Sequence, residues 1–218
     1  MKVELVRYTD NPHEAIELAA SNCYDSIPNG KIMKACYKSG HHSVLEFAQF
    51  HFHIEGVSRA LSHQLVRHRT ASFAQRSQRY CREDGFEIVC PMSIVKNVEA
   101  MKVYSEFHKL VQEVYDKLQE LDIPNEDARY VLPNACCTTI DVSMDFRNLC
   151  HFMNERLCSR AQWEIRELAN KMKDEVVKVF PEARSMLVPK CERFEYPFCP
   201  EAKSCGRHDT LKKIMNKG

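Results

Sequence analysis

The sequence predicts a mixed α/β fold of the α+β type that is rich in helix. Strand-like segments with alternating or aromatic residues lie in the N-terminal part, long segments carry apolar residues every three or four positions, and prolines and glycines separate the two kinds. Because 218 residues suit one compact domain, we expect a single domain in which several long helices pack on an antiparallel or mixed sheet.

The N-terminal part of the chain predicts two strands and three helices. The expected strands are residues 2–8 and 46–56, and the expected helices are residues 12–24, 30–39 and 57–68. Asn11 is a plausible cap for the first helix, and Pro12 suits its first turn. The second strand is favoured by its aromatic content. Gly40 is expected to end the second helix.

The remainder of the chain is predicted to be helical until it reaches an irregular tail. The expected helices are residues 93–121, 125–132, 142–157 and 160–179, and the expected tail is residues 186–218. In the longest segment, apolar residues from Ile94 to Leu121 recur at spacings of three and four, as in an amphipathic helix. Pro124, Pro133 and Pro181 are expected to end successive helices.

Composition and charge argue against several classes of protein. Lys and Arg total 31 and Asp and Glu total 30, so a formal net charge of +1 argues against a charged tail or a disordered chain. No run approaches the roughly 20 apolar residues of a membrane helix, and residues 1–10 lack the apolar core of a secretion signal. We therefore expect a cytoplasmic protein without membrane contact, whose eleven cysteines are mostly reduced.

The near-neutral charge conceals a basic segment between Glu55 and Glu83, where no acidic residue occurs. Its arginines are Arg59, Arg67, Arg69, Arg76, Arg79 and Arg82. Because lysine is absent and serines and glutamines lie between the arginines, the segment suits bidentate contacts to an anion better than a solvated face. A nucleotide or dinucleotide is the expected ligand. Nucleic acid is the alternative, which a sequence pI of about 7.6 disfavours.

Residues 67–80, RHRTASFAQRSQRY, and three further blocks in the same order resemble the flavin-dependent thymidylate synthase family. Residues 67–80 match the family pattern of R-H-R, seven residues and S, continued by R-Y. The further blocks are GHHS at 40–43, ARYVLP at 128–133, and NER at 154–156 followed by AQWEI at 161–165. The resemblance covers about residues 1–185, which it identifies as the catalytic domain, followed by the tail at 186–218.

The resemblance implies an enzyme that methylates dUMP to dTMP. In this family 5,10-methylenetetrahydrofolate donates the one-carbon unit, FAD reduced by NADPH carries the hydride, and no enzyme cysteine acts as nucleophile. Family members are homotetramers in which residues of different subunits share each active site. The expected ligands are therefore dUMP, folate and NADPH, the expected cofactor is FAD, and nucleic acid is not an expected partner.

The resemblance also assigns roles to individual residues. Arg156 matches the family arginine that polarises the pyrimidine, a role that suits a permanently charged guanidinium with two parallel donors. The residues that match nucleotide contacts are Gln64, Leu65, Val66, Arg67, Gln75, Arg76, Ser77, Gln78, Arg79, Arg129 and Arg156. The residues that match FAD contacts are Ser43, Arg67, His68, Arg69, Gln75, Asp145, Arg147 and His151.

Three positions depart from the usual family pattern. Gln75 stands where many members have glutamate, so a hydrogen-bonding role survives there, whereas an acid or base role does not. Asp145 and His151 replace residues that are often asparagine. Because a carboxylate is unfavourable beside phosphates, we expect Asp145 to contact sugar hydroxyls or an arginine.

No metal is expected in the reaction, but the tail contains one weak candidate site. Cys191, Cys199, Cys205 and His208 are residue types that zinc accepts. Their spacing lacks the C-x-x-C pair of common zinc sites, so reduced thiols in an irregular tail are the simpler interpretation. Two alternatives to the enzyme stay open: a nucleotide- or nucleic-acid-binding module without turnover, and a zinc-binding interaction protein built around the tail.

Overall fold

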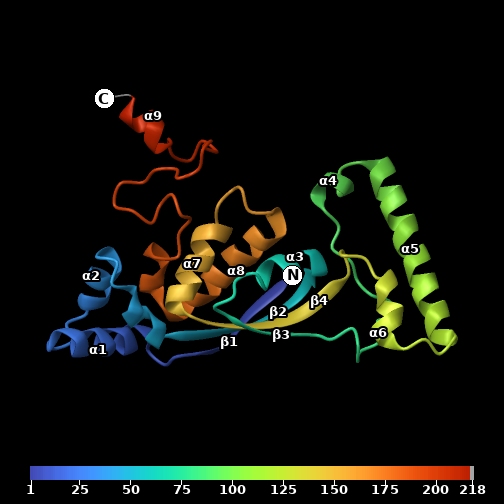
Figure 1. Ribbon diagram of the computed structural model, residues 1–218, viewed down its shortest axis with the longest axis horizontal. Helices are drawn as coiled ribbons and strands as arrows, with labels where there is room; N and C mark the ends of the chain where they lie inside the picture. The colour runs from blue at the N-terminus through green and yellow to red at the C-terminus, as the bar shows by residue number, and fades with distance from the viewer. Residues whose placement is uncertain (217–218) are drawn as a thin grey trace. The chain divides into compact units, whose positions relative to one another are not determined.

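The computed structural model describes residues 1–216 and confirms the mixed α/β class (Figure 1). Its four-stranded antiparallel sheet has the order β1-β2-β4-β3. The strands are β1 (Lys2–Tyr8), β2 (Gln49–Ser58), β3 (Ser72–Gln75) and β4 (Cys137–Asp145). No helix within residues 1–216 has the length and apolar character needed to cross a bilayer.

Twelve helical segments are assigned within the same residues. The α-helices are α1 (Pro12–Tyr24), α2 (Ile32–Lys38), α3 (Arg59–Leu65), α4 (Met92–Val95), α5 (Val98–Glu120), α6 (Asn125–Ala128), α7 (Phe146–Arg156), α8 (Trp163–Val179) and α9 (Leu211–Met215). The 3₁₀ segments are η1 (His42–Phe47), η2 (Arg129–Val131) and η3 (Pro181–Ser185). The chain forms two compact units. Unit 1 comprises residues 1–2, 54–67 and 74–141, and unit 2 comprises residues 3–53, 68–73 and the described residues from 142 onward.

The core of unit 2 is built on aromatic rings. Alternate side chains of β2 are buried, among them Phe50 and Phe52, because one face of the strand points into the core. The ring of Phe146, the first residue of α7, lies 5.9 Å from the Phe50 ring and 5.1 Å from the Phe180 ring. Phe180 follows α8, so these contacts hold α7 and the end of α8 against the strand (Figure 1).

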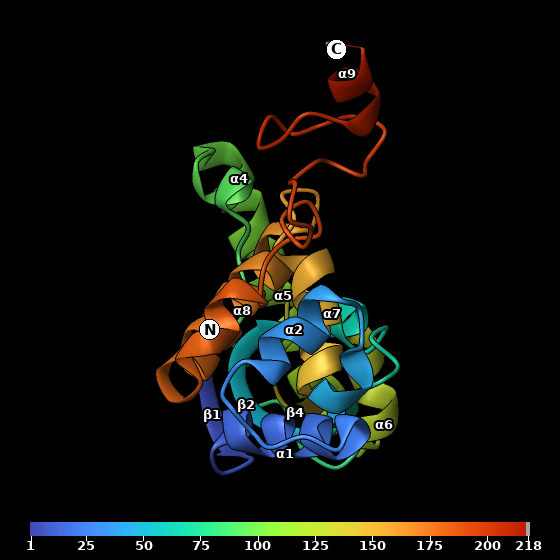
Figure 2. The same cartoon turned by 90° about the vertical axis from the view of Figure 1, so that its left-hand side faces the viewer.

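The predicted helices at the N-terminus are confirmed as α1 and α2, which lie next to each other in unit 2 (Figure 2). Gly40 ends α2 as expected: it has a φ of +79°, and the next residue, His41, donates its backbone N–H to the Cys36 carbonyl at 2.9 Å. The capping role predicted for Asn11 is wrong. Asn11 has a φ of +46° and caps no backbone N–H, and its side-chain amide instead donates to Glu14 at 2.6 Å.

The main correction concerns the helix predicted over 142–157. Residues 137–145 form β4, whose alternate side chains Thr138, Ile140, Val142 and Met144 are buried, and α7 begins only at residue 146. The β-branched residues before position 143 favour a strand. The alternation of buried and partly exposed side chains, with a period of two residues, continues through Met144. Asp145 marks the boundary, since its carboxylate accepts the Asn148 backbone N–H at 2.9 Å and so caps α7.

Two further predictions have shifted boundaries. The segment 93–121 is two helices, because the side chain of Asn97 accepts the Ala100 N–H and starts α5 after a break. The strand predicted over 46–56 starts later, since residues 42–47 form η1. Within residues 186–216, the tail is irregular except for the short α9.

Candidate functional site

A cavity of about 670 Å³ lies within unit 2, a size typical of sites for small molecules and cofactors. Its walls come from α2, the loop before η1, α7 and the tail. Three residues predicted to contact FAD line it, namely Asp145, Arg147 and His151. The cavity of unit 2 is therefore lined by side chains that lie about 100 residues apart in the sequence.

The charged groups of this cavity are partly paired. Arg147 Nη1 lies 2.5 Å from Glu46 Oε1, and both side chains are about half exposed. Lys38 and Arg193 also line the cavity, and the Arg193 guanidinium lies 4.5 Å from the centre of the Phe194 ring. The three cations outnumber the carboxylates of Glu46 and Asp145 that line the same cavity, and this excess of positive charge favours an anionic ligand. Lys38, Glu46 and Arg193 belong to no motif, so the sequence does not predict that they line this cavity.

The carboxylate of Asp145 is engaged at the start of α7. Its Oδ1 accepts the Asn148 backbone N–H at 2.9 Å, and its Oδ2 accepts the Asn148 side-chain amide at 2.6 Å. The helix N-terminus stabilises a negative charge there. Asp145 therefore orients α7, the helix that carries Arg147 and His151 to the cavity.

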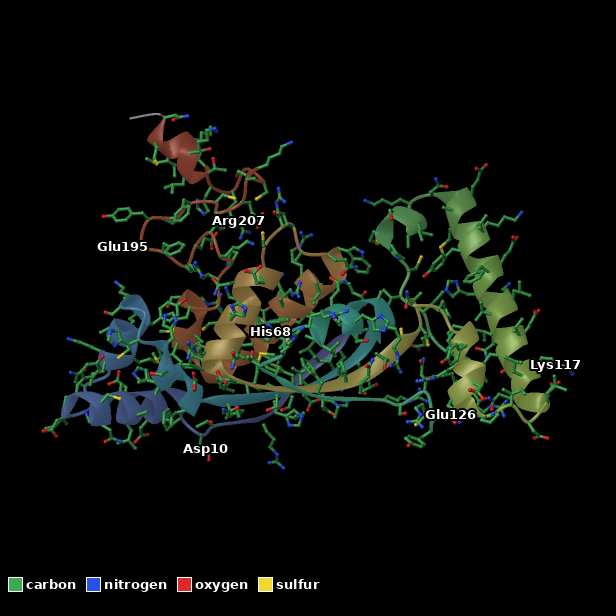
Figure 3. The ribbon with its side chains drawn as sticks, in the orientation of Figure 1. Asp10, His68, Lys117, Glu126, Glu195 and Arg207 are labelled. Atoms are coloured by element: carbon green, nitrogen blue, oxygen red, sulfur yellow. The ribbon has the colours of Figure 1, made fainter. Side chains whose placement is uncertain are left out.

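His68 is buried beside α7 (Figure 3). Its Nε2 lies 3.1 Å from the Asn148 carbonyl, its ring stacks on His151 at 5.2 Å, and the edge of Phe152 lies 5.4 Å away. Burial lowers the pKa of His68, and the nearby His151 and Arg156 lower it further. A neutral ring must donate to the Asn148 carbonyl through Nε2–H, which leaves Nδ1 as an acceptor.

The lowered pKa of His68 predicts a loss of stability in acid. The unfolded state, with a histidine pKa near 6.5, takes up the proton before the folded state does. The free energy of unfolding should therefore fall as the pH decreases below about 6.5. The decrease should be smaller in His68→Gln and unchanged in His63→Gln, which alters an exposed histidine. Denaturant titrations at a series of pH values measure this, and an equal decrease in His68→Gln and the parent would contradict the assignment.

In unit 1, two predicted nucleotide contacts, Arg79 and Arg129, meet at one residue of α6. Arg79 Nε and Nη2 lie 3.1 and 2.9 Å from Glu126 Oε2, and Arg129 Nε donates to the Glu126 carbonyl at 3.1 Å. Figure 3 labels Glu126 on this helix. The Arg79 and Glu126 side chains are about half exposed, so an anionic ligand can reach them. The Glu126 carboxylate contacts the Arg79 guanidinium in the same way as the phosphate group of a ligand would.

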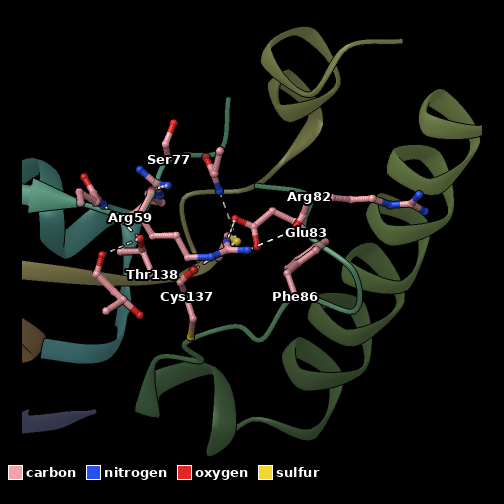
Figure 4. A network of polar contacts seen from close by, with 12 residues as sticks. Arg59, Ser77, Arg82, Glu83, Phe86, Cys137 and Thr138 are labelled. Atoms are coloured by element: carbon pink, nitrogen blue, oxygen red, sulfur yellow. Dashed lines mark hydrogen bonds and ion pairs between the residues drawn. The ribbon is translucent and has the colours of Figure 1, made fainter. Parts of the chain in front are cut away.

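Other residues of the basic segment hold unit 1 together (Figure 4). Arg76 forms an ion pair with the buried Glu83 and donates through Nη2 to the Arg82 carbonyl at 3.0 Å. Arg59 Nη2 donates in turn to the Arg76 carbonyl at 2.8 Å. Gln75 donates to the Ser62 hydroxyl at 2.9 Å. Arg76 and Gln75 thus have defined partners within the unit.

The remaining predicted residues differ in their exposure. Leu65 is fully buried, so only its backbone could reach a ligand. Ser43, Val66, Arg67 and Arg69 are exposed. Gln64, Ser77, Gln78 and Arg156 are half-buried. Apart from Arg156, the predicted nucleotide contacts belong to unit 1, whereas the predicted FAD contacts belong to unit 2 except for Arg67 and Gln75.

Comparison with known proteins decides the family. The family model described as "Thymidylate synthase complementing protein" (Thy1) matches residues 4–182. The flavin-dependent thymidylate synthase of Geobacter sulfurreducens is 41% identical over 232 aligned positions, which cover 100% of this chain and 99% of that protein. The chain belongs to the flavin-dependent thymidylate synthase family.

Other flavin-dependent thymidylate synthases agree with this assignment. The enzyme of Clostridium tetani is 40% identical over 98% of this chain and 96% of its own length. The crystal structure of the Helicobacter pylori enzyme, complexed with FAD and dUMP, superposes with a TM-score of 0.68 at 26% identity and covers 84% of this chain and 99% of that one. The family match ends at residue 182, so the tail lies beyond the part that the family model describes.

Proposed function

We propose that this flavin-dependent thymidylate synthase methylates dUMP to dTMP with 5,10-methylenetetrahydrofolate as the one-carbon donor and FAD, reduced by NADPH, as the hydride carrier. The observation that carries the proposal is the cation-lined cavity of unit 2, in a chain of this family. The Helicobacter pylori relative, crystallised with FAD and dUMP, supports the choice of cofactor and substrate.

The side chains of the cavity fit a flavin dinucleotide. Lys38, Arg147 and Arg193 supply positive charge for a diphosphate, and His42 and His151 supply flat rings at the same hollow. When bound, FAD would supply the hydride that reduces the transferred carbon. Arg147 and His151 of α7 would hold FAD in the cavity. Ser43, His68 and Arg69 are further proposed contacts. Burial keeps His68 neutral at neutral pH, so it would present a hydrogen-bond acceptor at Nδ1 without adding charge.

Arg156 would act on the pyrimidine ring of dUMP. A guanidinium stays charged and can donate two parallel hydrogen bonds, so it favours the negative charge that develops when C5 of uracil becomes nucleophilic. Arg79 and Arg129 would hold the phosphate at the place where both now contact Glu126. Gln64, Leu65, Val66, Arg67, Gln75, Arg76, Ser77 and Gln78 complete the proposed nucleotide contacts.

For two of the cysteines, Cys136 and Cys150, burial supports a mechanism without a cysteine nucleophile. Burial raises the pKa of Cys136 to about 12 and raises that of Cys150, which lines the cavity, well above its usual range. A thiol attacks as its thiolate, so both side chains are poor nucleophiles at neutral pH.

We further propose that the protein is a homotetramer, and α5 offers a surface for subunit contact. One stripe of α5, with Val111 and Tyr115, is buried within unit 1. A neighbouring stripe is apolar yet 40–66% exposed, and its residues are Val103, Phe107, Leu110 and Val114. Several large apolar side chains in one exposed row mark a contact surface, and a second copy of the chain is the occupant that a homo-oligomeric enzyme supplies. Sites shared between subunits would then combine residues of different chains.

A charge placed in this stripe tests the assembly. The double substitution Phe107→Asp and Leu110→Asp should convert the tetramer into smaller species, because a charge cannot be buried unpaired at the interface. Light scattering coupled to size-exclusion chromatography measures the mass. Lys109→Asp, away from the stripe on the same helix, is the matched control. A tetramer that persists in the double variant, or a monomeric parent, would contradict this role of α5.

The function itself is tested with the purified protein. We expect a visible flavin spectrum that NADPH bleaches, with faster bleaching in the presence of dUMP, and release of tritium from C5-labelled dUMP when methylenetetrahydrofolate is added. A colourless protein that binds no added FAD and releases no tritium would refute the proposal. Strong, salt-dependent DNA binding by such a protein would favour a binding module instead.

A further inference from the structure

The tail of unit 2 folds against the loop between α7 and α8. Arg160 in this loop donates to the Lys203 carbonyl at 3.2 Å and lies 3.6 Å from Glu201. Lys190 Nζ lies 2.5 Å from Glu201, and its backbone N–H donates to the Asn154 carbonyl at 2.9 Å. The Arg160 side chain is about half exposed, so its ion pair with Glu201 contributes about 0–1 kcal/mol. The Lys190 and Glu201 side chains are only 20% and 25% exposed, and α9 is the only α-helix within residues 186–216. A bond between the tail and the loop would add to these contacts.

A small cavity lies at the point where the tail meets the loop. Its walls include five side chains that bind soft metal ions: Cys158, Cys191, Cys199, Cys205 and His208. Its volume of about 20 Å³ admits one water-sized occupant. Cys191 and Cys199 are each 8% exposed, and sulfur atoms lie close to Arg207 in Figure 3. Four thiols from three separate segments around a space of this size are more than packing of the tail requires.

Two of the side chains that line this cavity, Cys191 and His208, lie near the spacing of metal ligands. The Cys191 sulfur, a His208 ring nitrogen and a Glu192 carboxylate oxygen all lie within 4.8 Å of one another. Ligands of a tetrahedral zinc ion lie about 3.3–3.8 Å apart, given bonds of 2.0–2.3 Å, so Cys191 and His208 need only a small contraction to bind one ion. Cys158, Cys199 and Cys205 line the same cavity. Glu192 Oε1 also lies 3.4 Å from His208 Nε2 and 3.5 Å from Arg207 Nη1. It is thus placed to orient the imidazole, as carboxylates do beside metal-bound histidines.

We propose that this cluster is a structural zinc site that fastens the tail to the α7–α8 loop. Cys158 comes from the loop, Cys191 and Cys199 from the tail, and the fourth ligand comes from the turn that carries Cys205 and His208. Structural zinc accepts either Cys₄ or Cys₃His, so both side chains of this turn suit the fourth position. Each ligating thiol releases its proton to solvent when the bond to zinc forms.

The zinc site would affect the enzyme by restricting the position of Arg156. Cys158 follows Arg156 by two residues, directly after α7 ends. A metal bond at Cys158 would limit the motion of the helix end that carries Arg156. The zinc ion itself would have four protein ligands, so it would take no part in the reaction.

Metal analysis of the untagged protein tests the site, without reference to activity. Purified without chelators, it should contain one zinc per chain. Cys158→Ser, Cys191→Ser, Cys199→Ser and the double variant Cys205→Ser with His208→Ala should each contain less than a tenth of that amount. Cys23→Ser, which alters an exposed cysteine of α1, should keep it. Replacement of zinc by cobalt(II) should produce a thiolate-to-cobalt charge-transfer absorption band, absent in Cys191→Ser.

Limited proteolysis provides a second readout for variants that fold poorly. Chelation of the parent should speed cleavage within the tail, and added zinc should restore protection, whereas the Cys191→Ser variant should be cleaved fast under both conditions. A parent protein that binds no zinc even when it is offered, zinc retained by Cys191→Ser, or a disulfide between two of these cysteines in place of the metal would each overturn the proposal.

Discussion

Arg156→Ala is expected to lower dTMP formation by about 10²–10³-fold, the cost of removing one donor aimed at a developing negative charge. The substitution should leave FAD bound, because the cations that line the cavity of unit 2 are Lys38, Arg147 and Arg193, and Arg156 is not among the lining residues. Arg156 ends α7, and its charge acts on the neighbouring His68, so it lies in the same part of unit 2. Tritium release from C5-labelled dUMP measures the step that Arg156 would promote.

Two variants make this result specific. Arg156→Lys keeps the charge but loses the planar pair of donors, so its rate should lie between those of the parent and Arg156→Ala. Arg184→Ala removes an exposed arginine of η3 and should leave the rate unchanged. Full activity in Arg156→Ala, or loss of the flavin spectrum in that variant, would refute the assigned role.

Arg76→Ala is expected to lower the free energy of unfolding by about 3 kcal/mol, the lower end of the range for breaking a buried ion pair. The carboxylate of Glu83 is 8% exposed and would lose its charged partner, whereas the Arg76 side chain is 37% exposed and keeps some contact with water. The substitution also removes the hydrogen bond from Arg76 to the Arg82 carbonyl. Denaturant unfolding measures the change.

A double-mutant cycle separates this loss from other effects of the substitution. Glu83→Gln removes the charge that would be left unpaired, so Arg76→Ala combined with Glu83→Gln should be more stable than Arg76→Ala alone. Arg79→Ala, which removes a half-exposed arginine paired with a half-exposed carboxylate, should change stability by less than about 1 kcal/mol. Equal losses of stability for Arg76→Ala and Arg79→Ala would contradict the structural role of the Arg76–Glu83 ion pair.

The sequence alone determined the family, the fold class and most of the helices. The segment 67–80 is a continuous motif, and an amphipathic helix such as α8 repeats its pattern every three to four residues, so both signals are local. The four family blocks could be read in order without knowing where any side chain lies. For the same reason the sequence could predict an anion site in the basic segment before its geometry was known.

Only the tertiary structure decided which charges and thiols meet. Arg76 is paired because Glu83 lies buried beside it in unit 1, and the start of α7 is set by the Asp145 cap and by the packing of Phe146 between Phe50 and Phe180. The cavity of unit 2 and the cysteine cluster of the tail join residues far apart in the chain. Contacts of this kind depend on which surfaces pack together, and a periodic pattern along the chain carries no record of its packing partner.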